Sequence, residues 1–199
     1  MAFNWREMWL IRKLIMWFNR FFNKTNIPIL FNQSPWNLAP GTTATWITTP
    51  TSAVNSNGGT ESCWVWGATS KADNVVVSFR VATLDGGAMY FGFKEASRVA
   101  SFGGGVYFFG AGGKFTIYSQ STVLGLVSVT TSDRLSISYD GAMYRFYKNG
   151  SPIQTRTRAQ NIADGGSPDE PKVCQIYAGF VGGGCNDVYF AEITGSKKS

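Results

Sequence analysis

The side chains best suited to chemistry in this sequence are its carboxylates, because the 199 residues include no histidine. Ser-His-Asp and Cys-His catalysis, and every metal site that uses histidine, are therefore excluded. We expect no enzyme. Glycan hydrolysis by two acids that meet only after folding is the least favoured function, and replacement of Asp133 or Asp187 would test it. The acids of the body are scattered: Glu61, Asp73, Asp85, Glu95, Asp133, Asp140, Asp164, Asp169, Glu170, Asp187 and Glu192.

No cofactor or metal is expected. A calcium site needs several oxygen ligands, and the sequence has no D-x-D-x-D run, so calcium has no positive support. The three cysteines, Cys63, Cys174 and Cys185, lack CxxC spacing, and their odd number argues against a disulfide framework. A bridge between Cys174 and Cys185 across a hairpin stays open, and buried reduced thiols are the favoured alternative.

The glycine-rich run 110–114 matches a phosphate-binding loop only in part. Phe108 stands where that motif requires glycine, and Phe115 stands where Ser or Thr would bind magnesium. The run therefore predicts a turn between two strands.

Four side chains are candidates for contacts with a sugar: Trp64, Trp66, Asp140 and Asn149. Trp64 and Trp66 share one face of a strand, where exposed rings would stack on sugars and buried rings would belong to the core, which is favoured. Asp140-Gly141 and Asn149-Gly150 are hairpin signals, so a role in the turn is favoured over a ligand contact for both.

Residues 2–23 contain neither Gly nor Pro and predict an amphipathic α-helix. A helix this apolar must bury its surface, and four ways remain open: a bundle of copies with a trimer favoured, a groove in another protein, a membrane interface, or its own sandwich. The side chains that would anchor it recur at spacings of three and four: Trp5, Met8, Trp9, Ile11, Leu14, Ile15, Trp17, Phe18, Phe21 and Phe22.

Positive charge is concentrated in residues 1–24, where five basic side chains against Glu7 supply +4 of the formal +6. The rest of the chain has no basic stripe, so nucleic-acid binding is not expected. Arg12, Lys13 and Arg20 interrupt the apolar run. Neither a signal peptide nor an ordinary transmembrane helix is therefore predicted, although residues 1–24 suit a membrane interface.

The residue composition changes after residue 25, and we expect four segments in the chain. Residues 1–25 form the anchoring helix, 26–60 a linker with one or two irregular strands, 61–195 an antiparallel β-sandwich, and 196–199 a basic tail. No helix is expected after residue 24. Strands separated by regular turn signals are predicted at 44–49, 63–66, 74–82, 88–93, 105–109, 115–119, 124–130, 134–139, 143–148, 152–157, 172–180 and 188–194.

The sharpest local pattern lies between residues 133 and 153. Leu135, Ile137 and Tyr139 alternate with Ser136 and Ser138, which predicts one buried and one solvated face. Two hairpin turns follow, so this segment predicts a β-meander.

That meander, D-R-L-S-I-S-Y-D-G followed by Y-R-F-Y-K-N-G, resembles the one in concanavalin A-like jelly-roll domains such as lectins, laminin-G and SPRY-type sandwiches. Segments 175–180 and 188–193 are similar to their closing strands. The resemblance covers residues 63–194 and implies a jelly-roll-like all-β sandwich, whereas the ligand does not follow from the fold. Glycanases of this fold class often carry E-x-D-x-x-E on one strand, which this sequence lacks.

The whole chain resembles bacteriophage and viral structural proteins such as head fibres, capsid-decoration proteins and tail adhesins. This resemblance implies a virion protein, made in the host cytoplasm, that attaches through its helix and displays the sandwich. Its partners would be other virion proteins or further copies of itself, with a cell-surface glycan as ligand. A stand-alone, lectin-like carbohydrate-binding module is the alternative.

Overall fold

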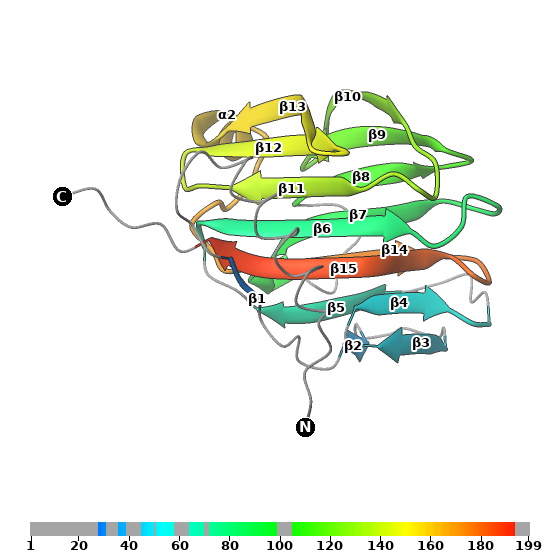
Figure 1. Cartoon of the computed structure of the whole chain (residues 1–199). Coiled ribbons are helices and arrows are strands. Elements are labelled where there is room, and N and C mark those ends of the chain that lie inside the picture. Colours follow the sequence, from blue (N-terminus) through cyan, green and yellow to red (C-terminus); the bar gives the residue numbers. More distant parts are fainter. Residues whose placement is uncertain are drawn as a thin grey trace, which may run out of the picture.

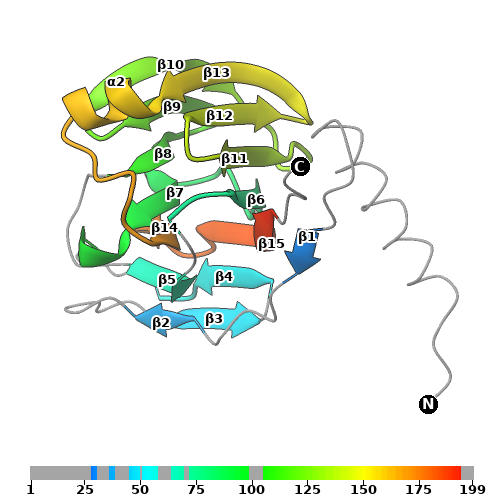
Figure 2. The ribbon, with the colours of Figure 1, turned by 90° about the vertical axis from the view of Figure 1, so that its left-hand side faces the viewer.

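The chain folds as two antiparallel β-sheets packed face to face, as the computed structural model shows (Figures 1 and 2). In Figure 2 the two sheets stand side by side, seen along their edges. The structure describes residues 28–30, 36–38, 45–49, 51–57, 64–69, 72–98 and 105–193. The predicted helix at 2–23, the tail at 196–199 and Cys63 lie outside these residues.

One sheet has eight strands. Short β1 (Pro28–Leu30) pairs with the end of β15, at Ile193, Glu192 and Ala191. The other strands follow in the spatial order β13 (Ser151–Thr157), β12 (Met143–Lys148), β11 (Leu135–Tyr139), β6 (Val75–Val81), β15 (Gly184–Ile193), β4 (Ser52–Asn55) and β3 (Trp46–Thr49).

The second sheet has seven strands. Their spatial order is β10 (Thr122–Ser128), β9 (Lys114–Ser119), β8 (Val106–Ala111), β7 (Met89–Glu95), β14 (Lys172–Ala178), β5 (Trp64–Thr69) and β2 (Asn37–Leu38). The predicted all-β sandwich is therefore confirmed. The described residues between 26 and 60 contribute four short strands to the two sheets, where one or two were expected.

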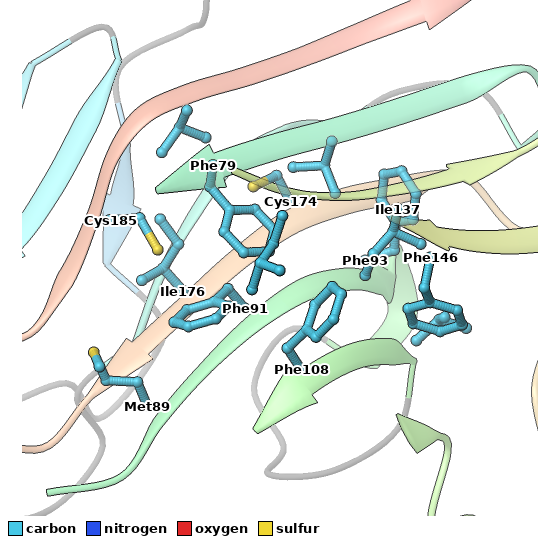
Figure 3. Close-up of a cluster of buried hydrophobic side chains, with 14 of the residues drawn as sticks. Phe79, Met89, Phe91, Phe93, Phe108, Ile137, Phe146, Cys174, Ile176 and Cys185 are labelled. Carbon is cyan, nitrogen blue, oxygen red and sulfur yellow. The ribbon is translucent and has the colours of Figure 1, made fainter. Parts of the chain in front are cut away.

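The core lies between the sheets and is rich in phenylalanine (Figure 3). Phe108 of the seven-stranded sheet meets Phe79 and Phe146 of the opposite sheet edge-on, at ring-centroid distances of 5.9 and 5.6 Å. Cys174 and Cys185 lie in this core as free, buried thiols, so the open disulfide alternative does not hold. Burial raises the pKa of the Cys174 thiol to about 12.

The predicted meander is confirmed, but its second face is not solvated. Leu135, Ile137 and Tyr139 face the core, while Ser136 and Ser138 are also buried, at 5% and 2% exposure. On this face larger side chains lie in register on β12, Tyr147 beside Ser136 and Arg145 beside Ser138, and they flank the small serines. The Ser136 hydroxyl there donates to Ser78 Oγ at 3.0 Å.

The expectation of no helix after residue 24 is wrong. A 3₁₀ turn covers Ala96–Arg98, and helix α2 covers Arg158–Ala163 between β13 and β14. Thr157 begins α2 with a capping box, because its hydroxyl accepts from the Gln160 N–H while the Gln160 side chain accepts from the Thr157 N–H. This Thr-x-x-Gln spacing was visible in the sequence, and six residues were too few for a helical period to show.

Candidate ligand-binding face of the seven-stranded sheet

The seven-stranded sheet turns an aromatic face away from the core. Met89, Phe91 and Phe93 point into the core. Because side chains alternate along a strand, Tyr90 and Lys94 lie on the opposite face. Cross-strand register extends that face from β7 to its neighbours: Tyr107, Phe109, Thr116, Tyr118, Gln175 and Tyr177.

The centre of this face is a ladder of stacked tyrosines. The Tyr90 and Tyr107 ring centroids are 4.2 Å apart, and those of Tyr107 and Tyr118 are 5.0 Å apart with an interplanar angle of 13°. Gly92 makes this packing possible, because a Cβ there would lie 2.8 Å from the Tyr107 Cβ. The central ring faces therefore contact each other and are not free for a ligand.

Burial keeps this centre closed and its tyrosines protonated. Tyr90 and Lys94 are both 0% exposed, and the Lys94 Nζ lies 5.8 Å from the Tyr90 ring centroid. Burial, and then the neighbouring Tyr118, raise the pKa of Tyr107 to about 12, and its hydroxyl donates to the Gln120 carbonyl at 3.0 Å. Burial lowers the pKa of Lys94 to about 8.

The part of the face toward β10 is less buried than its centre. Phe109 and Tyr118 are half-buried, with an edge-to-face contact between their rings at 6.4 Å, Thr116 lies in register opposite Phe109, and Lys114 is exposed at the start of β9. We call Phe109, Thr116, Tyr118 and Lys114 the aromatic patch. It combines ring surface with a hydroxyl and an ammonium group, which are the elements of a site that orients a polar ligand with one apolar face.

Sequence reasoning did not single out the aromatic patch, although a signal for it was present. In β9, Lys114, Thr116 and Tyr118 alternate with Phe115 and Ile117, which are buried at 0% and 2% exposure. This period of two places the first three residues on one outward face. The predicted turn at 110–114 also made the preceding strand its neighbour, but the local pattern did not give the register that puts Phe109 opposite Thr116.

Trp64 and Trp66 are placed by the register of β5. Trp64 lies opposite Tyr177 and Trp66 opposite Gln175, so both positions belong to the aromatic face of the sheet. β5 and the aromatic patch are separated by β14 and β7. The other two early tryptophans, Trp36 and Trp46, pack against the core, and the Trp36 indole N–H donates to the Thr49 carbonyl at 2.9 Å.

Asp140 and Asn149 do not join this face, because both hold turns of the other sheet. The Asp140 carboxylate accepts from the N–H groups of Ala142 and Met143 at 3.0 and 2.8 Å and pairs with Arg145. Asn149 has a positive φ of 49° in its turn, and its side chain accepts from the Arg134 N–H at 2.8 Å. These contacts agree with the turn role that the sequence favoured.

None of the carboxylates in the described part of the chain forms a catalytic pair on the aromatic patch. Burial alone would raise the pKa of Asp133, but hydrogen bonds from the Thr130 N–H, Asn149, Lys148 and the Thr130 hydroxyl lower it to about 2. Asp187 pairs with Arg80 and Arg134 on the eight-stranded sheet, at 3.4 and 3.5 Å. A general acid needs a raised pKa. Among the acids that the structure describes, the pKa is lowered for Asp133, Asp140, Asp164, Asp169 and Glu170.

A buried polar cluster that the sequence did not reveal closes one end of the sandwich. Glu95, 1% exposed, accepts from Gln120 Nε2 at 2.9 Å through Oε1, while its Oε2 has no hydrogen-bond partner among the described residues. Lys172, also 1% exposed, donates to the carbonyl oxygens of Pro168 and Glu170 at 2.8 and 2.5 Å. Burial lowers the pKa of Lys172 to about 8, against the opposing effect of Glu95.

Within the described ranges, no three His, Cys, Asp or Glu side chains gather where they could hold a metal ion. No helix in those ranges is long and apolar enough to cross a membrane. The side chains of Glu95 and Lys172 are buried, whereas the aromatic patch reaches the surface, so the patch is the candidate ligand site.

Comparisons with known proteins show similarity in fold. A Bacillus subtilis protein of unknown function with a galectin-like fold matches 86% of this chain and 100% of its own, with a TM-score of 0.51 and 10% identity. Bacillus licheniformis β-glucanase (87% and 99% covered, 14% identity, TM-score 0.48) and a Bacillus subtilis carbohydrate-binding module (82% and 96%, 11%, 0.47) also match. No family model and no curated protein matches the sequence.

The first of these likenesses shows a galectin-like jelly-roll β-sandwich, and at 10% identity it shows the fold alone. The similarities to the β-glucanase and the carbohydrate-binding module, with TM-scores below 0.5, say nothing about function. Binding modules and enzymes are both built on such sandwiches, so function must be argued from the site.

Proposed function

We propose that this protein is a non-enzymatic, carbohydrate-binding β-sandwich that holds its ligand on the aromatic patch. The observation that carries the proposal is the pair of half-buried rings, Phe109 and Tyr118, beside the Thr116 hydroxyl and the exposed Lys114. A pyranose with several axial C–H groups has one apolar face, which packs on an aromatic ring, and hydroxyl groups at its rim. Thr116 and Lys114 are placed to bond those hydroxyl groups.

The way Tyr118 is held supports this role. Tyr107 covers one face of the Tyr118 ring by parallel stacking at 5.0 Å, so the ring is fixed before a ligand arrives. A pre-organised ring loses little conformational entropy on binding. The opposite face of Tyr118 is directed toward β10, where Val123 is its register partner. Binding without chemistry is supported by the lowered pKa of the carboxylates described above.

Replacing Tyr118 with alanine is expected to weaken glycan binding about 5- to 30-fold, because one stacking contact contributes about 1–2 kcal/mol. Phe109→Ala should have a similar effect, and Thr116→Val a smaller one. The measurement is binding of the full chain to an array of neutral and acidic oligosaccharides, followed by calorimetry on the best one. Ile47→Ala is the matched control, since Ile47 is an exposed apolar residue, 63% exposed, on β3 of the other sheet.

Binding that is unchanged in both Tyr118→Ala and Phe109→Ala would overturn this assignment. Sugar release by the wild-type protein that disappears in Asp133→Asn or Asp187→Asn would instead establish the glycan hydrolase alternative. Binding that depends on Trp64 and Trp66 and not on Tyr118 would move the site toward β5.

We further propose that the sandwich is displayed on a virion, attached through residues 1–25. The support is the sequence pattern of that segment, whose apolar rows need a partner surface. The partner is either another virion protein or further copies of the chain. The alternative of a stand-alone lectin-like module needs no such attachment.

Light scattering on the full chain and on a chain beginning at Asn26 tests the attachment. The full chain is expected to form a discrete oligomer, with a trimer favoured, and the truncated chain a smaller species. Flotation of only the full chain with anionic lipid vesicles, with both species monomeric, would make the segment a membrane anchor and contradict the assembly proposal.

A further inference from the structure

Strand β10 is an edge strand with little of the usual protection against pairing with another chain. It ends the order of the seven-stranded sheet and has β9 as its strand partner. No charged residue occurs from Phe115 to Ser132. Leu126 is 80% exposed and Val123 is 58% exposed. Natural edge strands are commonly blunted by charges or proline, and the end strand of the other sheet, β13, does carry Pro152 and Arg156.

The hydrogen-bond pattern shows which backbone groups of β10 point outward. The Val129 N–H donates to the Gly113 carbonyl at 2.8 Å, so Val129 and Gly113, the residue just before β9, form a hydrogen-bonded pair. Bonded and non-bonded pairs alternate in an antiparallel ladder. Ser128 and Leu126, opposite Lys114 and Thr116, are therefore non-bonded pairs. Their N–H and C=O groups point away from β9.

Side chains of the eight-stranded sheet occupy the edge on either side of Leu126. Gln154 Nε2 donates to the Leu124 carbonyl at 2.6 Å, and Lys148 Nζ donates to the Ser128 carbonyl at 2.7 Å. Within the described part of the chain, no side chain caps Leu126 itself. Leu126 thus combines an outward N–H, an outward C=O and a highly exposed side chain. The carbonyl groups of Leu124 and Ser128 on either side already accept hydrogen bonds.

We propose that this edge is a contact between two copies of the chain, related by a two-fold axis at Leu126. An extended peptide would need a longer run of free backbone groups than the two caps leave. A second copy needs only the Leu126 N–H and C=O, because a two-fold axis pairs them with the same groups of the other copy. The two exposed leucines then meet on the outer face, and Gly125 has no side chain to oppose Val127 of the second copy.

Charge does not oppose a second copy approaching at this edge. The formal charge of +6 is held by residues 1–24, with +4, and by Lys197 and Lys198, so residues 25–196 are formally neutral. The β10 edge carries no charge of its own, and Lys148, which reaches it at Ser128, is paired with Asp133 at 3.1 Å. The contact is small compared with the roughly 1,200 Å² that stable interfaces bury, so it forms a weak dimer with a Kd on the order of 100 µM.

Cysteine cross-linking of the full-length protein tests this geometry. In the proposed dimer the two Leu126 Cα atoms form a bonded antiparallel pair, about 5.5 Å apart, which suits a disulfide. Leu126→Cys is therefore expected to give a covalent dimer under mild oxidation at least about ten-fold faster than Val123→Cys. Val123 is the matched control because it is exposed on the same strand, yet its two copies would lie about 20 Å apart.

The wild-type protein supplies the background from its own cysteines, and Leu126→Ser shows whether a polar residue at this exposed position leaves the fold intact. Leu126→Lys should also lower the weight-average mass of the full chain in sedimentation equilibrium relative to wild type, because association through residues 1–25 is the same in both proteins. Equal cross-linking rates for Leu126→Cys and Val123→Cys, or no covalent dimer from either, would overturn the proposal. Its failure leaves glycan binding untouched, because cross-linking does not report on the ligand.

Discussion

Replacing Phe108 with alanine is expected to lower the free energy of unfolding by about 3–5 kcal/mol. Phe108 is 0% exposed and touches Phe79 and Phe146 of the opposite sheet, so its removal leaves a cavity where the two sheets meet (Figure 3). The surrounding rings come from several strands held in ladders and cannot collapse into that cavity. Chemical denaturation monitored by tryptophan fluorescence measures the effect.

Phe109→Ala is the matched control for Phe108→Ala, because the neighbouring residue on β8 points to the other side of the sheet. Phe109 is half-buried on the aromatic face, so its replacement should cost about 1 kcal/mol or less of stability while weakening glycan binding. Equal destabilisation by the two variants would mean that the aromatic face is a second core. The assignment of Phe109 to a ligand site would then be wrong.

Raising the pH from about 8 to about 9 is expected to stabilise the protein, by about 1 kcal/mol. Burial lowers the pKa of both Lys94 and Lys172 to about 8, below the ordinary value of 10.5. Above pH 8 the unfolded chain therefore binds more protons at these lysines than the folded chain does, so stability rises with pH. This contribution is fully present above pH 10.5 and is lost as the pH falls through 8.

The rise should end near pH 9 because other groups act in the opposite direction. Burial raises the pKa of Cys174 to about 12 and that of Cys185 well above its ordinary value of 9.0. The pKa of Tyr107 is likewise raised, to about 12 from 10.0. In the unfolded chain these groups lose protons that the folded chain retains, so they reduce stability above pH 9 to 10.

Lys172→Met isolates the lysine contribution from the cysteines and tyrosines. The difference in unfolding free energy between wild type and Lys172→Met should shift in favour of the wild type by about 1–3 kcal/mol from pH 7 to pH 10. Val173→Ala, a buried change without titration on the same strand, should differ from wild type by the same amount at every pH. A difference for Lys172→Met that stays constant with pH would show that Lys172 remains charged when buried.

Much of the sandwich could be predicted from the sequence, because the alternation of side chains and the turn residues that mark a strand are local patterns. In the segment 133–153, alternating residues and two turn signals predicted β11, β12 and β13 with nearly the observed bounds. Asn149-Gly150 predicted a hairpin because both residues readily adopt positive φ, and they have φ values of 49° and 84°. For the same local reason, a turn role could be favoured over a ligand contact for Asp140 and Asn149.

What the sequence could not decide is which outward positions become buried. Ser138 was expected to be solvated, but it lies in register between Arg145 of β12 and Val76 of β6, a strand more than fifty residues earlier in the chain. The short helix α2 was missed because six residues are too few to show a helical period. The capping box of Thr157 and Gln160 that begins the helix was its one signal in the sequence.

The sequence by itself determined the all-β class, the turns and the absence of histidine chemistry, because composition and period are properties of neighbouring residues. Only the tertiary structure decided that Tyr107 stacks on Tyr118 across two strands and that Phe109 lies beside them. It also decided that β10 is an edge, with Leu126 between two capped carbonyls. The first depends on the register of the β8–β9 hairpin and on side-chain conformation. The second depends on which strands pair across long separations in the sequence, so neither follows from the residue types of a single strand.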